Sequence, residues 1–248
     1  MSLQHYQRFA NLSHSGWIHR ASYWKFWSGR LIELLSLSKA DRILDLGGGC
    51  GDLALALKKR IRFRHEIVCV DPSEAMLAVA KEAGLKTIHA KAEVFARSAP
   101  RASFDRIIMK QMIHHIPSSK RNSLYRELHG ILAPGGRVAI LTMPETILYP
   151  MFQAAIDGFE KKQIKHASLA RGLSASGFRV EIHPCDYPVR ISWERFASAV
   201  RERFISDLRP FSDSEIERGL REIRRQTGEK KQLYFHDRLV VFLGFKES

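Results

Sequence analysis

Four glycines between an apolar run and a helical pattern constrain this chain more than any other feature. Residues 42–57 read RILDLGGGCGDLALAL and place Gly47, Gly48, Gly49 and Gly51 within five positions. A surface turn needs one or two glycines, whereas four permit a tight backbone and let a ligand approach main-chain N–H groups at a helix N-terminus. A strand that passes through such a turn into a helix is typical of nucleotide-binding α/β folds.

Short apolar runs and helical periods alternate through the next hundred residues. The pattern predicts strands at residues 42–46, 66–71, 86–90, 104–110 and 137–143. It predicts helices at residues 52–60, 72–84, 119–132 and 167–178. Almost wholly apolar strands that are each followed by a helix favour a parallel sheet covered on both faces. Two more strands, at 179–185 and 233–245, are expected to pair at the sheet edge, which makes seven in a mostly parallel sheet.

The chain is expected to form one compact domain with helical cap segments. Residues 1–41 precede the first strand and form the predicted N-terminal helical cap. Residues 42–248 form the main domain, with a helical insertion at about 192–231. Neither segment has a linker-like flank.

Composition excludes several classes of protein. The N-terminus lacks the apolar centre of a secretory signal, and no uncharged apolar stretch approaches the ~18 residues of a membrane span, so we expect a cytoplasmic location. Cys50, Cys69 and Cys185 are scattered without metal-binding spacing, so neither a metal site nor a disulfide is expected. The net charge of +14 favours acidic partners, but solvated charges that serve solubility explain it equally well.

The glycine spacing separates two kinds of ligand. A dinucleotide fingerprint, G-x-G-x-x-G, would need glycine at Asp52, so that pattern fails. The spacing D-x-G-x-G-x-G, from Asp45 to Gly51, resembles motif I of the class I S-adenosylmethionine-dependent methyltransferases. The resemblance continues in order through PSEAML after Asp71, FDRIIMKQMIHHI at 104–116 and ELHGILAPGGRVAIL at 127–141. It implies a Rossmann-like sheet and S-adenosylmethionine as cofactor, with S-adenosylhomocysteine as product.

The resemblance also implies which residues hold the cofactor. Asp71 is expected to bind both ribose hydroxyls, because a carboxylate accepts two hydrogen bonds from a diol. Members of the family often carry an Asp after the third strand that accepts from the adenine amino group. Lys91 stands there and cannot accept, so Glu93 or a main-chain oxygen serves, or that bond is missing. The implied cofactor residues are Asp45, Gly47, Gly48, Gly49, Gly51, Asp71, Pro72, Met76, Ala92, Glu93, Lys110 and Gln111.

Candidates for catalysis lie after the fourth strand and in the N-terminal cap. Methyl transfer from a sulfonium is an in-line displacement, so the protein mainly positions the acceptor and excludes water. Where a base is needed, the candidates are His114, His115 and Tyr23, although paired histidines at this place in the family more often support the loop.

Residues about 1–27 of the N-terminal cap, with the helices at 192–231, are expected to form a lid that recognises the substrate. The predicted substrate-facing residues are Trp17, His19, Arg20, Trp24 and Trp193. Such a lining favours a planar or apolar acceptor, with an acidic group near Arg20. The alternative is that the aromatic side chains only pack the cap onto the domain.

Competing functions stay open at this stage, as does the oligomeric state. The leading hypothesis is a small-molecule methyltransferase. Residues 11–25 also resemble the start of the ubiquinone/menaquinone C-methyltransferases, which makes a quinone-ring acceptor an alternative. An RNA methyltransferase is disfavoured, because MKQM at 109–112 lacks the Asn/Asp-Pro-Pro-aromatic run and no RNA-binding module follows, so no specific nucleic acid is expected. A non-catalytic cofactor-binding protein is the third class.

Overall fold

A computed structural model describes residues 21–204 and 206–247. Its centre is a seven-stranded sheet in the order β3-β2-β1-β4-β5-β7-β6. The strands are β1 (Ile43–Leu46), β2 (Val68–Asp71), β3 (Lys86–His89), β4 (Phe104–Lys110), β5 (Leu132–Thr142), β6 (Arg179–Ser192) and β7 (Gln232–Phe245). Strands β1 to β5 pair in parallel, and β7 runs antiparallel to both β5 and β6. The predicted strands and their mostly parallel arrangement are thus confirmed.

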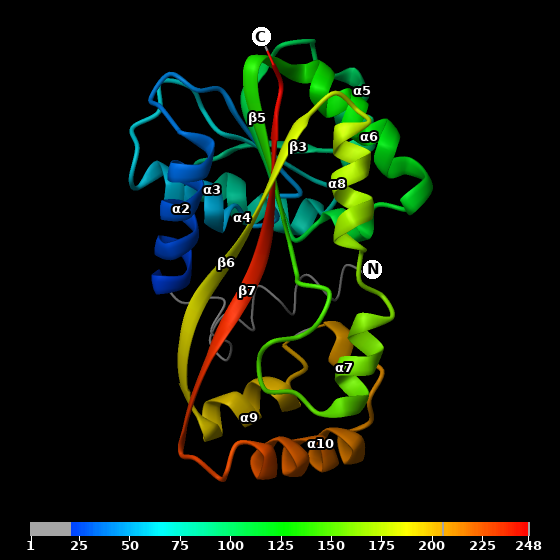
Figure 1. Ribbon diagram of the computed structural model, residues 1–248. Helices are drawn as coiled ribbons and strands as arrows, with labels where there is room; N and C mark the ends of the chain where they lie inside the picture. The colour runs from blue at the N-terminus through cyan, green and yellow to red at the C-terminus, as the bar shows by residue number, and fades with distance from the viewer. Residues whose placement is uncertain (1–20, 205, 248) are drawn as a thin grey trace.

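Helices cover both faces of the sheet (Figure 1). The described helices are α2 (Ala21–Leu35), α3 (Asp52–Lys58), α4 (Glu74–Glu82), α5 (Ala92–Ser98), α6 (Ser118–Ile131), α7 (Gln153–Glu160), α8 (His166–Ser174), α9 (Trp193–Arg201) and α10 (Asp213–Gln226), with short 3-10 turns at Ile113–His115 and Ser206–Leu208. Two clusters of buried hydrophobic side chains lie on the two faces of the sheet. One joins α2, α3 and α4 to the sheet, and the other joins α5, α6 and α8 to it. Successive residues of a strand alternate between them, as Ile107 and Ile108 do.

Strands β6 and β7 continue well beyond the rest of the sheet as a long two-stranded ribbon. Their pairing runs without interruption from Arg179 opposite Phe245 to Ser192 opposite Gln232. The sequence predicted a strand at residues 179–185, whereas β6 continues through Pro188 to Ser192. That boundary is wrong, since β6 lies at the sheet edge, where a proline does not need to donate a ladder hydrogen bond.

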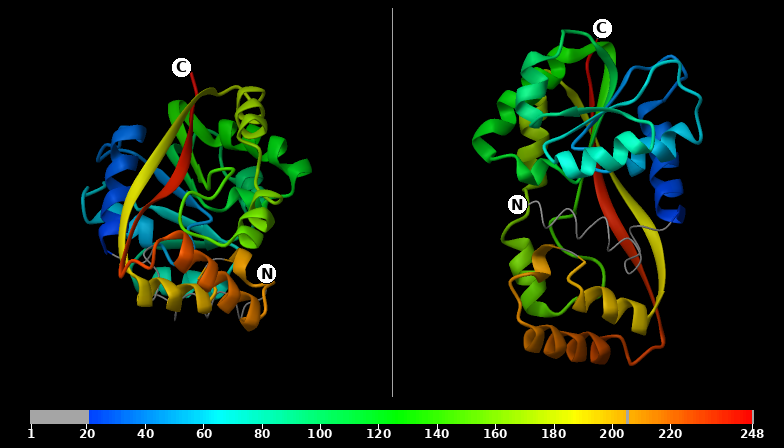
Figure 2. Two further views of the ribbon diagram at one scale, coloured as in Figure 1. Left: turned by 60° about the horizontal axis from the view of Figure 1, so that its bottom comes forward. Right: turned by 180° about the vertical axis from the view of Figure 1, so that it is seen from behind.

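Three helices gather at the far end of this ribbon. Figure 1 shows α7, α9 and α10 below the core, and the view from behind in Figure 2 shows the ribbon running between the two parts, as do the segments before and after α7. Helices α9 and α10 occupy the stretch between β6 and β7, where the sequence placed an insertion at about 192–231. We call α7, α9 and α10 with their connections the cap, which is distinct from the predicted N-terminal helical cap at residues 1–41. None of the helices in the described ranges combines the length and apolar character that a membrane crossing needs.

Helix α2 belongs to the packed core as well as to the site. Tyr23 is 1% exposed and Trp27 is fully buried, and both lie in the cluster with α3. The predicted lid segment at residues 1–27 therefore needs correction, because its last turn supports the core. Burying two large aromatic rings is a packing role that a mobile lid would not allow.

Candidate functional site

The glycine loop between β1 and α3 has a backbone that side chains would obstruct. Gly47, Gly49 and Gly51 have φ angles of 76°, 56° and 79°, a region that glycine adopts without strain. A Cβ atom on Gly47 would lie 2.7 Å from Met112 Cβ, and one on Gly49 would lie 2.7 Å from Met76 Cε. The loop thus lies between two methionine side chains and keeps its N–H groups near the first turn of α3.

Asp71 ends β2 next to this loop. Its carboxylate accepts hydrogen bonds from the Gly49 N–H at 3.1 Å and from the Ser73 N–H at 2.8 Å. The side chain is 8% exposed, so burial raises its pKa while those two N–H donors lower it. A carboxylate held by two main-chain donors is fixed in orientation and keeps lone pairs for two hydroxyl groups of a ligand.

Asp45 carries buried charge that nothing in the described ranges satisfies. It is 2% exposed, and neither Oδ1 nor Oδ2 has a hydrogen-bond partner there. Burial raises the pKa of Asp45 to about 7, against the lowering effect of the Lys110 charge. An unsatisfied buried carboxylate costs at least ~1–3 kcal/mol. The glycine backbone, Asp71 and this unpaired carboxylate fit a ligand that brings hydroxyl and amino groups, as S-adenosylmethionine would.

Lys110 ends β4 on the face of the sheet that α2 covers. Its Nζ lies 5.1 Å from the ring centre of Tyr23 and 4.9 Å from that of Trp24. Desolvation lowers the pKa of Lys110 to about 8, although Asp237 and Asp45 raise it. Cation–π contacts contribute ~0.5–2 kcal/mol each, whereas moving an ammonium away from water costs several kcal/mol. The two rings therefore do not fully compensate the charge.

The turn after β4 brings the other predicted residues of this segment together. Gln111 has a φ of 53° and places its N–H on Leu141 O at 2.8 Å. The His114 and His115 rings lie 3.9 Å apart, and both side chains are exposed. Neighbouring protein still displaces water, and with the charges of His115 and Arg121 it lowers the pKa of His114 to about 4. An imidazole with so low a pKa is neutral at pH 7 and is a weak proton acceptor.

The residues after β3 were predicted to contact the adenine of the cofactor, and that role stays a prediction. His89 Nε2 lies 3.0 Å from the main-chain oxygen of Pro72, which ties β3 to the turn after Asp71. Lys91 is exposed at the N-cap of α5, Ala92 is buried and Glu93 lies 3.9 Å from Lys120.

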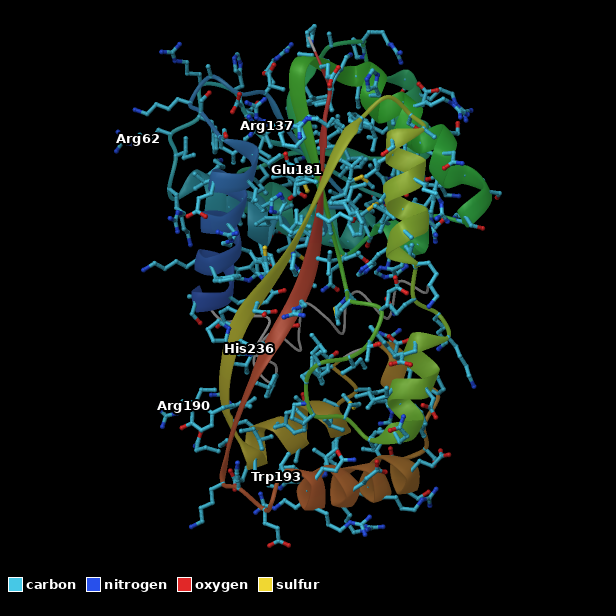
Figure 3. All side chains as sticks on the ribbon, in the orientation of Figure 1. Arg62, Arg137, Glu181, Arg190, Trp193 and His236 are labelled. Carbon is cyan, nitrogen blue, oxygen red and sulfur yellow. The ribbon has the colours of Figure 1, made fainter. Side chains whose placement is uncertain are left out.

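The structure separates the predicted substrate-facing residues. Trp24 touches Lys110, whereas Trp193 packs 6.1 Å from Phe196 and lies 4.7 Å from the Arg224 guanidinium. Figure 3 places Trp193 at the far end of the ribbon, between α9 and α10. Its contacts in the described ranges serve cap packing. Trp17, His19 and Arg20 fall outside the described residues.

Two residues near Tyr23 were missed by the sequence analysis. Tyr187 of β6 packs edge-on against Tyr23 at 5.2 Å, and its hydroxyl is 2.7 Å from Ser22 Oγ. Asp237 of β7 pairs with Tyr187 in the ribbon and is 3% exposed. Burial raises the pKa of Tyr23 and of Tyr149, and the charge of Asp237 raises both further. The one available signal was an acidic residue inside the apolar strand 233–245.

Comparison with known proteins bears on this geometry. Residues 43–136 match the methyltransferase domain family. These residues, which are less than half of the chain, are similar to a methyltransferase domain. The domain holds β1 to β4, α3 to α6 and the glycine loop, and it ends at the start of β5.

Curated relatives match about half of the chain. A demethylmenaquinone methyltransferase from Thermus thermophilus is 34% identical over 122 residues, which are 48% of this chain and 54% of that protein. The chain thus spans about half the length of the curated relatives it matches.

Solved structures agree on the fold over most of the chain. A protein from Anabaena variabilis, assigned as an antibiotic-biosynthesis methyltransferase, aligns with a TM-score of 0.69 at 19% identity and covers 88% of this chain and 96% of its own. The cyclase SpnF aligns with a TM-score of 0.57 at 17% identity, covering 90% and 80%. At these identities the likeness concerns architecture.

Proposed function

We propose that this protein is an S-adenosylmethionine-dependent methyltransferase that acts on a small molecule. The observation that carries the proposal is the conjunction at the carboxyl ends of β1 and β2. There the positive-φ glycine loop, the oriented Asp71 carboxylate and the Asp45 carboxylate, which has no hydrogen-bond partner among the described residues, lie on neighbouring strands. This is the edge at which open α/β sheets bind ligands.

Each residue has a separate task in this proposal. Asp71 binds the ribose hydroxyls, the glycine loop from Gly47 to Gly51 lies against the amino-acid portion, and Asp45 accepts from the donors of that portion. When bound, S-adenosylmethionine supplies a methyl group whose bond to sulfur breaks with both electrons going to sulfur, as an acceptor lone pair forms the new bond. S-adenosylhomocysteine and the methylated acceptor are the products. Exclusion of water falls to the side chains above this edge, foremost Tyr23 and Trp24.

A quinone-ring C-methyltransferase is the alternative that a specific finding favours. The Thermus relative is named for action on demethylmenaquinone, and aromatic side chains surround Lys110 here. That relative aligns with only 48% of the chain, so the ring class of the acceptor carries over less firmly than the methyl transfer.

Incubation of the purified protein with S-adenosylmethionine and a metabolite extract tests the proposal. Mass spectrometry should detect an acceptor that gains one methylene mass and an equal amount of S-adenosylhomocysteine. Cofactor binding without turnover on any extract would instead favour a binding protein, or a reaction other than methyl transfer, since SpnF is a cyclase on a related fold. A protein without affinity for either adenosyl compound would refute the proposal.

A further inference from the structure

Lys110 is a charged side chain with no ion-pair partner among the residues that the structure describes. In the ranges 21–204 and 206–247, its Nζ has ring contacts with Tyr23 and Trp24 but no hydrogen bond or ion pair. Residues 1–20 contain neither Asp nor Glu, so that segment has no side-chain carboxylate to offer. The nearby carboxylates Asp45 and Asp237 influence the ammonium through space without reaching it.

The surroundings of Lys110 are flat and aromatic. Tyr23 and Trp24 meet edge-to-face with ring centres 5.2 Å apart, and Tyr187 also packs edge-to-face against Tyr23 at 5.2 Å. The Tyr23 hydroxyl is buried, and the described part of the chain gives it no hydrogen-bond partner. A hydroxyl and an ammonium that both lack a hydrogen-bond partner among the described residues thus occur together in one aromatic setting.

Strand register places Lys110 beside the cofactor loop. Asp45 of β1 pairs with Ile108 of β4, and Lys110 follows Ile108 by two residues. Residues two apart on a strand point to the same face, so Asp45 and Lys110 extend toward the face that α2 covers. Asp45 is accordingly among the carboxylates whose charge stabilises the Lys110 ammonium and raises its pKa.

We propose that Lys110, between Tyr23 and Trp24, binds an oxyanion on a planar acceptor, such as an ionised ring hydroxyl. This inference rests on the proposed function and names its substrate class. The ammonium favours the ionised hydroxyl, and the negative charge makes that oxygen, or the ring carbon next to it, a better nucleophile. Attack by oxygen forms the C–O bond with no further proton loss. Attack by the ring carbon forms a C–C bond, after which that carbon releases its proton to water.

A carboxylate on the cofactor's amino-acid tail offers the same chemistry to Lys110. The two sources differ in which ligand should lose affinity when the ammonium is removed. Loss of S-adenosylhomocysteine binding, with no effect on methylthioadenosine, which lacks that tail, would assign Lys110 to the cofactor. Loss restricted to an anionic ring would assign it to the acceptor.

The experiment measures binding to the full chain loaded with S-adenosylhomocysteine, by calorimetry. The probes are 2-hydroxy-1,4-naphthoquinone, whose hydroxyl is ionised at neutral pH, and its methyl ether, which is neutral. Wild type should bind the anion about tenfold more tightly than the ether, and Lys110→Met should remove that preference while Lys110→Arg retains part of it. Lys161→Met, at an exposed lysine of the cap, is the matched control and should change neither affinity.

Each outcome decides the inference. Equal affinity of wild type for anion and ether, or binding of neither, overturns it even if Lys110→Met fails to fold. A Lys110→Met protein that loses S-adenosylhomocysteine but keeps methylthioadenosine and the anion preference also overturns it. Wild type that binds no S-adenosylhomocysteine rejects the proposed function itself, whereas normal cofactor binding without anion preference rejects the acceptor assignment alone.

Discussion

Asp71→Ala is the sharpest test of the cofactor site, because Asp71 has both a structural and a ligand role. In the protein its two oxygens accept from the Gly49 and Ser73 N–H groups. In the proposed complex the remaining lone pairs accept from two ribose hydroxyls. The substitution should therefore lower stability and, separately, lower cofactor affinity.

The two effects have different sizes. Hydrogen bonds to a charged group contribute ~1.5–3 kcal/mol each, but water partly replaces them at this edge, so we expect a loss of roughly 2–4 kcal/mol in binding. That loss corresponds to a dissociation constant about 30-fold to about 1000-fold higher. The two orphaned N–H groups should reduce the free energy of unfolding by about 1–3 kcal/mol, or a few degrees in Tm.

Calorimetric titration with S-adenosylhomocysteine and a thermal melt measure these effects on the same protein. Asp105→Ala is the control. The Asp105 carboxylate, near the amino end of β4, accepts hydrogen bonds from the main-chain N–H and the guanidinium of Arg42. It should lose stability and keep cofactor affinity. If Asp71→Ala binds the cofactor as wild type does, the assignment of the ribose site is wrong.

Three further predictions concern charge and the N-terminus. Burial raises the pKa of Asp45 from 3.8 to about 7, so between these pH values the folded protein holds a proton that the unfolded chain releases. The stability of the folded protein therefore falls as the pH rises through this window. Asp45→Asn should flatten the resulting decline of Tm between about pH 4 and about pH 7. If residues 1–20 form a lid, deleting them should leave a folded protein that binds the cofactor but turns over poorly. Deleting residues 1–27 also removes the buried Tyr23 and Trp27, and thermal melts should then show loss of the fold. Binding to RNA should be weak and fall steeply with salt in a filter assay; sequence-selective binding at physiological salt would contradict this.

The core of the fold could be predicted because local signals and burial agree there. β1 and β4 are short apolar strands, and their parallel neighbours follow from the strand–helix alternation. The helices α5 and α7 were missed, since both are short and α5 follows Lys91 without a side-chain cap. Short helices owe their stability to tertiary packing more than to sequence signals.

The candidate site likewise contains residues that the sequence could predict and residues that it could not. Asp45 and the glycines lie in one continuous motif, and the family resemblance placed Asp71 beside them at the end of the neighbouring strand β2. Tyr187 and Asp237 reach the site through the β6–β7 ribbon, whose length depends on edge pairing across a large sequence separation. Single-sequence patterns do not encode such pairing. The side-chain environment of Lys110 depends on it and on α2, and so emerged only with the tertiary structure.

The last prediction concerns whether the cap folds and works as a separate unit. Gly219 lies in α10, and a Cβ atom there would overlap the ring of Phe152 at the start of α7. Phe152 is 3% exposed and packs on Phe211, so the ring has little freedom to move aside. Gly219→Ala should therefore destabilise the cap by about 1–3 kcal/mol, despite alanine's higher helix propensity.

Gly158→Ala is the matched control within the same cap. A Cβ atom added at Gly158, inside α7, would meet no atom within 4 Å, so alanine should add about 0.5–1 kcal/mol of stability. Hydrogen exchange should show faster opening of α7 and α10 in Gly219→Ala alone. Affinity for S-adenosylhomocysteine should stay within about twofold of wild type, because the glycine loop and Asp71 lie in the core. A parallel loss of cofactor affinity would mean that cap and core unfold as one cooperative unit, and that the cap cannot act as an independent acceptor-binding element.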